Sequence, residues 1–328
     1  MKGDNNRSIL LFAFNFLPSR SIFLTADFHG VKRIGRKEVS LLEIFLQACV
    51  NGLLIGGFYS LMGMGQNIIF GVMKIINFCH GEMLMIGMYL TFVFNTYLGL
   101  DPYLSIPLVV IVMFALGALI QHTLITPSLG TKSFTNLLFL TVGLGMLFQN
   151  LALVIFSPNY RTITTSYSTK TLSLGPVTMS LPKMISFIGL IIVTVALFWF
   201  LRYTPTGKKI RAVSQNPIGA EVVGINAKRI YIITYGLGCA LAGIAGALLT
   251  LFYMVYPMVG ASFSFKALIV VVVGGFGSIQ GAFFAGIFLG LLETLSSLIV
   301  GPTYRDLTVF VTFIVILVVR QMIKLRRR

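Results

Sequence analysis

The chain has 328 residues, of which 56% are hydrophobic and only 10% are charged. Soluble globular domains typically have roughly 45–50% apolar and about 25% charged residues, so this composition excludes an ordinary soluble protein. The formal net charge is +16, which would suggest nucleic-acid binding in a soluble chain. Here the basic residues gather at the two ends and in one internal segment, with long apolar runs between them. That pattern is typical of a polytopic membrane protein, and we expect no nucleic-acid partner.

Residues 1–40 differ from the rest of the chain, because they combine seven basic residues with three acidic ones. Their apolar run from Ser8 to Leu17 is shorter than the roughly 20 residues that a bilayer span requires. We therefore expect a basic N-terminal extension that lies at the membrane surface or is disordered. A transmembrane domain is predicted over 41–320, followed by a basic cytoplasmic tail at 321–328.

The apolar runs of the transmembrane domain are continuous and do not alternate, which favours helices over a β-barrel. Helices also satisfy their own backbone hydrogen bonds within lipid. We predict an all-α polytopic membrane protein with eight to ten transmembrane helices. The expected apolar blocks are 44–73, 82–98, 103–126, 134–156, 184–202, 230–256, 263–277, 280–300 and 305–320.

Positive charge predicts the orientation, since cytoplasmic segments carry an excess of Lys and Arg. The segment 203–229 and the tail are therefore placed inside. Counting blocks backwards then puts Lys132 inside, and Asp101 and the loop 157–183 outside. The same count puts the basic extension outside, against the rule. A break within the block 44–73, which contains six glycines, would remove this conflict.

Two segments interrupt the apolar blocks with polar groups or glycines. Asn77 and Glu82 lie where the chain is near or inside the membrane, so they need partners or a wet cavity. This first segment is either a pore-lining or gating element, or a capped turn at the cytoplasmic interface.

In the second segment, Gly274, Gly275 and Ser278 predict a helix that stops and restarts. Interrupted segments in both halves suggest discontinuous helices and a possible inverted repeat; the alternative for the glycines is close helix packing.

Two charged residues lie within or beside apolar blocks. Lys266 is close to the start of one block, so its side chain either extends to the interface or serves transport. Glu293 lies well inside another block. Its carboxyl group either takes part in transport or is satisfied by neighbouring helices.

The segment 203–229 contains the signals of a short helix. Asn216 followed by Pro217 is typical of a helix start, with an Asn cap and proline in the first turn. Gly224 is suited to end the helix in a left-handed conformation. Such a helix is suited either to dock in a groove of a partner protein or to lie on anionic membrane lipid.

Several stretches resemble, in the same order, the LivH-type permease subunits of branched-chain amino acid ABC transporters. They are INFCHGEM at 76–83, RAVSQNPIGAEVVGI at 211–225, GLGCALAGIAGAL at 236–248 and VVVGGFGSIQGAFFAG at 271–286. The resemblance implies an ATP-driven importer in a bacterial inner membrane. Its expected partners are a second permease subunit, two ATP-binding subunits and a periplasmic or lipid-tethered substrate-binding protein.

The loop also resembles the coupling pattern of ABC importers, E-A-A, three residues and Gly. Ala220 matches the second alanine and Gly224 the glycine, whereas Ile218 replaces the glutamate and Gly219 the first alanine. The residues expected to couple to the ATPase are Gln215, Asn216, Ala220 and Gly224. The residues expected to line the translocation path are Asn77, Glu82, Gly274, Gly275 and Ser278.

No catalytic residues, metal site or cofactor are expected. The sequence after Gly207 and Lys208 lacks the Ser or Thr of a phosphate-binding loop, so ATP hydrolysis is assigned to partner subunits. Three scattered histidines and three cysteines in apolar surroundings show no metal-ligand spacing.

Two alternatives to an amino-acid importer stay open: the same architecture importing urea, short amides or a sugar, and a stand-alone channel or secondary transporter.

Overall fold

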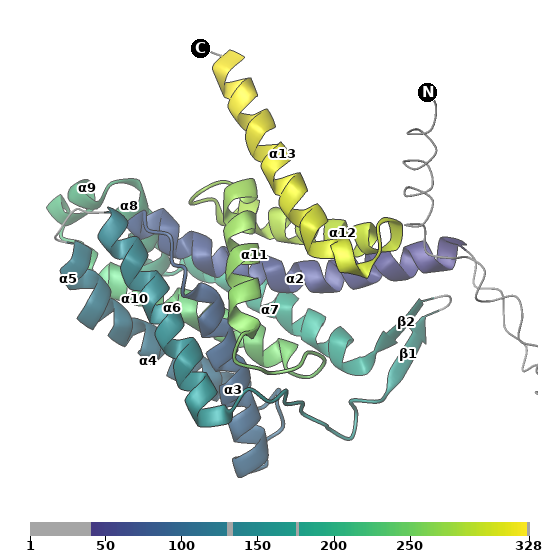
Figure 1. Ribbon diagram of the computed structural model, residues 1–328. Coiled ribbons are helices and arrows are strands. Elements are labelled where there is room, and N and C mark those ends of the chain that lie inside the picture. The colour runs from purple at the N-terminus through teal and green to yellow at the C-terminus, as the bar shows by residue number, and fades with distance from the viewer. Residues whose placement is uncertain (1–40, 130–133, 175–176, 327–328) are drawn as a thin grey trace, which may run out of the picture. The chain divides into compact units, whose positions relative to one another are not determined.

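The computed structural model describes residues 41–129, 134–174 and 177–326 (Figure 1). The predicted extension 1–40 and Lys132 lie outside these residues. The long helices are α2 (Leu41–Met73), α3 (His80–Leu98), α4 (Ile106–Ile120), α6 (Phe134–Phe156), α7 (Leu181–Tyr203), α10 (Ala227–Leu249), α11 (Val259–Gly274), α12 (Ile279–Ile299) and α13 (Arg305–Arg326). Each corresponds to one predicted apolar block, which confirms the all-α membrane architecture.

Shorter elements connect the long helices. They are the π-helical turn η1 (Gln121–Ile125), α5 (Thr126–Leu129), β1 (Thr171–Leu174), β2 (Val177–Ser180), α8 (Pro205–Gln215), α9 (Pro217–Val222) and the 3-10 turn η2 (Pro302–Tyr304). The hairpin formed by β1 and β2 was not expected from the sequence. It is antiparallel and lies in the loop before α7, outside the predicted membrane segments.

Three pairs of segments that are distant in sequence meet on one side of the helices, here called the outer side. Hydrogen bonds join Gln47 with Thr178 (2.8 and 2.9 Å), Tyr167 with Asp101 (2.7 Å) and Arg161 with Val255 (2.8 and 2.9 Å). The beginning of α2, the end of α3, the hairpin and the segment after α10 therefore share this side. Asp101 and the loop 157–183 lie together here, as the count of helices predicts.

The opposite ends of the helices meet on the inner side. Arg320 on α13 donates to the carbonyl of Val272 near the end of α11 (2.8 Å). Thr141, in the second turn of α6, lies 3.5 Å from the carbonyl oxygen of Ile76. The basic helix α8 follows α7 directly on this side. The positive-inside rule predicts that this inner side faces the cytoplasm.

The helix count agrees with the predicted range of eight to ten. Seven helices of the described residues are long and apolar enough to cross a membrane, and α11 is a shorter apolar helix. Helices α3 and α11 also run between the two sides, so nine long helices of the described residues connect them, of which seven have the length and hydropathy of a membrane span. The expected break in the block 44–73 is wrong, since α2 runs without interruption for 33 residues. The start of α2 accordingly lies on the outer side.

The glycines of α2 serve close packing against α12. A Cβ atom built on Gly56 would lie 2.8 Å from the Cα atom of Ile287, and one on Gly52 would lie 2.9 Å from the Cα atom of Leu291. Real Cβ atoms do not approach other atoms so closely. Small residues therefore bring the two backbones together, as is usual for helices in lipid.

Helices α2 and α11 run in the same direction. Tyr59 packs on Phe263, and Asn67 farther along α2 bonds to Gly275 after the end of α11. Corresponding helices of an inverted repeat would run in opposite directions. These two interrupted segments consequently do not form an inverted pair, and an inverted repeat elsewhere in the chain stays a prediction.

Candidate functional site

The first interruption separates α2 from α3. Helix α2 ends at Met73, and Lys74 adopts a left-handed conformation with a φ of 58°. Its ammonium group donates to the carbonyl of Gly71 (2.8 Å), which satisfies one of the free carbonyls at the helix end. The chain then turns back through Asn77, whose side-chain oxygen accepts from the amide of Cys79 (3.1 Å).

The second interruption separates α11 from α12. Gly275 and Gly277 have φ angles of 93° and 80°, a conformation that residues with a Cβ atom rarely adopt. The hydroxyl of Ser278 then caps α12 by accepting from the amide of Gly281 (3.0 Å). The predicted stop and restart of a helix at this position is confirmed.

Both interruptions are tied to adjacent residues of α2. The amide nitrogen of the Gln66 side chain donates to the carbonyl of Asn77 (3.1 Å). The side-chain nitrogen of Asn67 donates to the carbonyls of Gly275 (3.0 Å) and Ser278 (2.8 Å). The side-chain oxygen of Asn67 accepts from the amide of Gly277. One short stretch of α2 therefore holds both helix breaks.

The polar residues of the first interruption are buried among helices. Asn77 is 2% exposed and Glu82 is 4% exposed. The amide of Gly81 donates to the hydroxyl of Ser264 on α11 (2.8 Å), which in turn donates to the carbonyl of Phe78 (3.0 Å). This segment is thus an embedded joint between α2, α3 and α11, and its role as a pore-lining or gating element stays a prediction.

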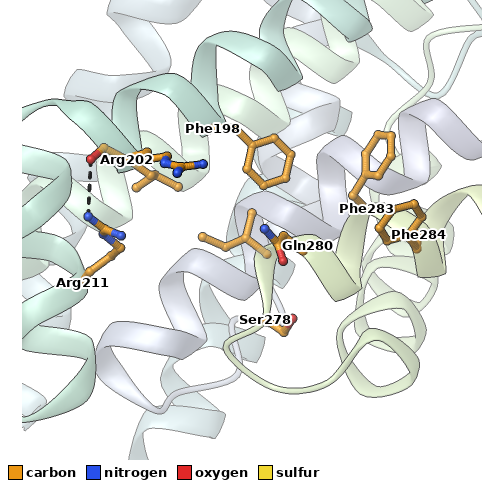
Figure 2. Close-up of a pocket in the computed structure, with 9 residues that line it drawn as sticks. Phe198, Arg202, Arg211, Ser278, Gln280, Phe283 and Phe284 are labelled. Carbon is orange, nitrogen blue, oxygen red and sulfur yellow. Dashed lines mark hydrogen bonds between the residues drawn. The ribbon is translucent and has the colours of Figure 1, made fainter.

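Beside the second interruption, a cavity of about 860 Å³ opens on the inner side (Figure 2). Figure 2 shows Phe198 of α7 on one side and Phe283 and Phe284 of α12 on the other, with Gln280 below Phe198 in this view. Of the five predicted path residues, Ser278 lines this cavity, whereas Asn77, Glu82, Gly274 and Gly275 do not. Arg202 and Arg211 lie at its α7–α8 wall, where Arg211 faces the carbonyl of Arg202 (3.4 Å).

The loop between α7 and α10 forms the predicted short helix, α9. Asn216 caps it by accepting from the amide of Gly219 (3.0 Å), and Pro217 is its first residue. Gly224 follows the helix with a φ of 82°, and its amide donates to the carbonyl of Glu221 (3.0 Å). The local prediction of an Asn-capped helix before a left-handed glycine is therefore confirmed.

The faces of α9 differ in exposure. Ala220 is buried against the body of the protein, whereas Ile218, Val222 and Val223 are 74%, 82% and 73% exposed. Gln215 is exposed at the end of α8. Such a cluster of exposed aliphatic side chains on one short helix is typical of a surface that contacts another protein.

A charged cluster lies in the membrane domain away from both interruptions. Lys266 contacts the carboxylate of Glu293 (2.9 Å) and donates to the hydroxyl of Tyr59 (3.0 Å). Arg305 contacts the same carboxylate oxygen at 2.9 Å, and Asp306 lies 3.3 Å from Lys266. Lys266 therefore does not extend alone to an interface, and Glu293 is satisfied in part by neighbouring helices.

Sequence analysis missed Gln66 and Asn67, the residues that connect the two breaks. The signal was present, because two adjacent side-chain amides within an apolar helix are costly unless they bind something. Tyr59 and Arg305, which complete the charged cluster, were likewise not among the predicted residues.

Among the described residues, no group of three or more His, Cys, Asp or Glu side chains is placed to hold a metal ion. The described cysteines are free thiols, and Cys79 and Cys239 are buried. The described residues thus contain two helix breaks joined by α2, a cavity, and a short helix with exposed aliphatic side chains.

Comparison with known proteins identifies the family. Residues 48–320 match the family described as "Branched-chain amino acid transport system / permease component". The high-affinity branched-chain amino acid transport system permease protein BraD of Pseudomonas aeruginosa is 29% identical over 84% of this chain and 94% of its own length. LivH of Salmonella typhimurium, a permease protein of the same kind of system, is 30% identical over 84% of this chain and 93% of its own length.

A shorter match concerns the nucleoside ABC transporter permease protein NupB of Lactococcus lactis. It is 29% identical over 58% of this chain and 56% of its own length. No solved structure matches the chain. The extent of the family match, together with the multi-pass helical fold, shows that the chain belongs to the family of permease components of branched-chain amino acid transport systems.

Proposed function

We propose that this chain is the membrane-spanning subunit of an ATP-driven importer for branched-chain or other small amino acids. The observation that carries the proposal is α9, a capped helix on the inner side that presents Ile218, Val222 and Val223 to its surroundings. A channel or secondary transporter that works alone has no need of such a docking helix. The family membership supports the same conclusion.

The energy for transport comes from partner subunits in this proposal. The segment after Gly207 and Lys208 lacks the phosphate-binding sequence of an ATPase. The complete importer consists of this chain, a second permease subunit, two ATP-binding subunits and a substrate-binding protein on the outer side. Its location is the bacterial inner membrane, with α9 in the cytoplasm.

The contacts suggest a route from the ATPase to the transport path. Helix α9 packs against α8 and α10, and α8 packs against α2 and α7. Helix α2 carries Gln66 and Asn67, which hold the two breaks. Displacement of α9 by the ATP-binding subunits is therefore transmitted through α8 and α2 to both hinges.

Transport then follows from a two-state equilibrium. In one state the path is open to the outer side and in the other to the inner cavity beside Ser278. ATP binding to the partners shifts the balance, because the partners bind α9 differently in the two states. Gln215, Asn216, Ala220 and Gly224 form or support the coupling element. Asn77, Glu82, Gly274, Gly275 and Ser278 lie at the breaks that move.

The test is purification of the chain from its own membrane in mild detergent, followed by mass spectrometry and reconstitution into liposomes. We expect stoichiometric ATP-binding subunits, a second permease, and ATP-dependent leucine uptake that requires the binding protein. A pure, solitary chain that moves solute without ATP would overturn the proposal.

The choice of cargo is tested in the same liposomes. The similarity to NupB makes nucleosides the second candidate, so leucine, uridine, urea and fructose are compared at equal concentrations. Leucine is expected to be taken up preferentially. Uptake of uridine without leucine would keep the importer and replace its cargo.

A further inference from the structure

The cavity of about 860 Å³ on the inner side has a distribution of charge and aromatic side chains that a transport path alone does not require. Helices α7 and α12 both pack against α2, and the cavity separates the inner ends of these two helices. Its walls come from the end of α7, from α8, and from the start of α12 with the turn before it. The cavity is therefore a gap between membrane helices at the level where they meet the cytoplasm.

Two arginines give this cavity a positive charge. Arg202 is the residue before the last of α7, Arg211 lies in the second half of α8, and both line the cavity. No acidic residue that the structure describes lines it or forms an ion pair with either arginine. An amino acid would find no carboxylate here for its ammonium group, whereas a phosphate needs only cations. Contacts between guanidinium groups and phosphate are among the strong charge-assisted hydrogen bonds.

The polar and aromatic parts of the walls lie at different depths. On α7, Phe198 precedes Arg202 by one helical turn, which places it about 6 Å deeper in the membrane. On α12, Phe283 and Phe284 follow Gln280 by about one turn and lie deeper for the same reason. Both walls thus change from polar to aromatic in the same direction, which is the order of headgroups and acyl chains in one leaflet of a bilayer.

Residues at the border of the cavity face the bilayer. Phe284 is 70% exposed, although it belongs to a membrane-spanning helix. Trp199, the neighbour of Phe198 close to the inner end of α7, is 60% exposed. Tryptophan gathers at the interface between membrane and water, so it marks the depth of the inner headgroups at this end of α7. Basic pockets between transmembrane helices on the cytoplasmic side are typical sites for anionic headgroups.

We propose that this cavity binds an anionic phospholipid of the inner leaflet. The phosphate binds Arg202 and Arg211, and an acyl chain lies between Phe198 and the two phenylalanines of α12. Ser278, at the inner end of the transport path, lies apart from both arginines in Figure 2. The inference goes beyond the proposed function, because it assigns to the chain a lipid ligand that is not transported.

The experiment is photo-crosslinking in phosphatidylcholine nanodiscs that contain the chain with the subunits that copurify with it. Two probes carry the same diazirine-bearing acyl chain and differ only in the headgroup, which is either phosphatidylglycerol or phosphatidylcholine. Mass spectrometry of the peptides maps the labelled positions. We expect labelling around Phe198 and Phe284, at least about fivefold stronger for phosphatidylglycerol, since two arginines attract its net charge.

Three variants assign the contacts. The double variant Arg202→Met/Arg211→Met is expected to label equally with both probes. The matched control Lys209→Met/Arg229→Met removes the same charge from exposed inner residues that do not line the cavity, and is expected to keep the preference for phosphatidylglycerol. Phe284→Ala is expected to weaken labelling by both probes and to keep their ratio. Gel filtration verifies that each complex is assembled.

A competition experiment on the wild type identifies the source of the anion, and decides the matter even where a variant fails to assemble. Unlabelled phosphatidylglycerol is expected to displace its probe, whereas glycerophosphoglycerol, the same headgroup without acyl chains, is expected to have no effect at millimolar concentration. Displacement by glycerophosphoglycerol would assign the cavity to a soluble anion and overturn the inference.

Two further outcomes would overturn it. One is equal labelling of the wild type by both probes, or a preference that survives in Arg202→Met/Arg211→Met. The other is absence of label from the cavity in the assembled complex, which would mean that another subunit covers it. Labelling requires neither cargo nor ATP, so its result is independent of the proposed function.

Discussion

Gln66 and Asn67 are consecutive residues of α2, yet their side chains hold two helix breaks that are about 200 residues apart in the chain. Consecutive helical residues project about 100° apart, so one turn of α2 reaches both joints. Any rotation or shift of α2 therefore changes the contacts at both breaks. This arrangement links the two breaks through a single turn of α2.

Replacement of Asn67 by alanine removes its side-chain hydrogen bonds to the turn between α11 and α12. Three such bonds are lost, at about 1 kcal/mol each, and buried carbonyls lose their partner. We expect the melting temperature of the purified complex to fall by several degrees and ATP-dependent uptake to fall at least about tenfold. Scanning fluorimetry and liposome uptake measure the two effects.

The control is Asn150→Ala on α6. Asn150 is exposed, and its side chain donates only to the carbonyl of Met146 in the same helix (2.7 Å). This variant is expected to retain the stability and uptake of the wild type. If both alanine variants behave alike, the link between α2 and the second break has no role in transport.

Substitutions at Gly224 test whether its left-handed backbone conformation is needed, because there is room for a side chain at this position. Its φ is 82°, and nothing lies within 4 Å of a Cβ atom built there. Asparagine tolerates the left-handed region, whereas valine does not. We therefore expect Gly224→Asn to keep substrate-stimulated ATP hydrolysis and Gly224→Val to lose most of it, with both inserted normally. Equal activity of the two variants would show that the glycine is not needed for coupling.

Two substitutions of Asn216 change the N-terminal cap of α9 to different extents. Asn216→Asp retains an acceptor for the amide of Gly219, whereas Asn216→Ala removes it and destabilises the helix by about 1 kcal/mol. We expect the alanine variant to recruit less ATP-binding subunit during purification and the aspartate variant to recruit a normal amount. Quantitative mass spectrometry of the two complexes decides whether the cap matters.

The sidedness of the loops can be tested by labelling in a Cys49→Ser background, since Cys79 and Cys239 are buried. An impermeant maleimide added to spheroplasts is expected to label Lys170→Cys and not Lys209→Cys. Inverted vesicles should give the opposite result. Labelling of both positions from the same side would contradict a crossing by α7, the long helix between these two positions.

The contact between Tyr167 and Asp101 predicts a stability effect without pH dependence near neutrality. Burial and the hydrogen bond to Asp101 raise the pKa of the Tyr167 phenol well above its usual range. Its folded-state pKa exceeds the unfolded value of about 10, so the stabilisation is fully present below pH 10 and lost only at higher pH. Tyr167→Phe should therefore lower the melting temperature equally at pH 6 and pH 9. A lower melting temperature of Tyr167→Phe at pH 6 but not at pH 9 would mean that another titrating group controls this contact.

Apolar runs and caps were enough to predict most of the fold. Each long helix begins within four residues of the start of an expected block and ends within seven residues of its end, and α9 has its predicted cap and terminating glycine. These features depend on local sequence, in which hydropathy and capping residues dominate. The hairpin of β1 and β2 was missed because its eight residues are too few for a periodic pattern.

The site was harder to predict, because it depends on contacts between distant segments. The glycines of α2 suggested a break, yet they are used for packing against α12, and nothing local distinguishes these two uses. Gln66 and Asn67 acquire their role only when the two interruptions return to the same turn of α2. Lys266 and Glu293 were considered separately, although they form one ion pair across 27 positions.

The packing of α2 against α12 also constrains the order in which the protein is made. The ribosome completes α2 long before it synthesises the helix whose backbone fits against Gly52 and Gly56. Until then, the glycine face of α2 and the side-chain amide of Asn67, whose partners are at Gly275, Gly277 and Ser278, lack their final neighbours in the bilayer. The earliest of these long helices to emerge is thus among the last to be fully packed, and during that interval the nascent chain is open to aggregation and to quality-control proteases.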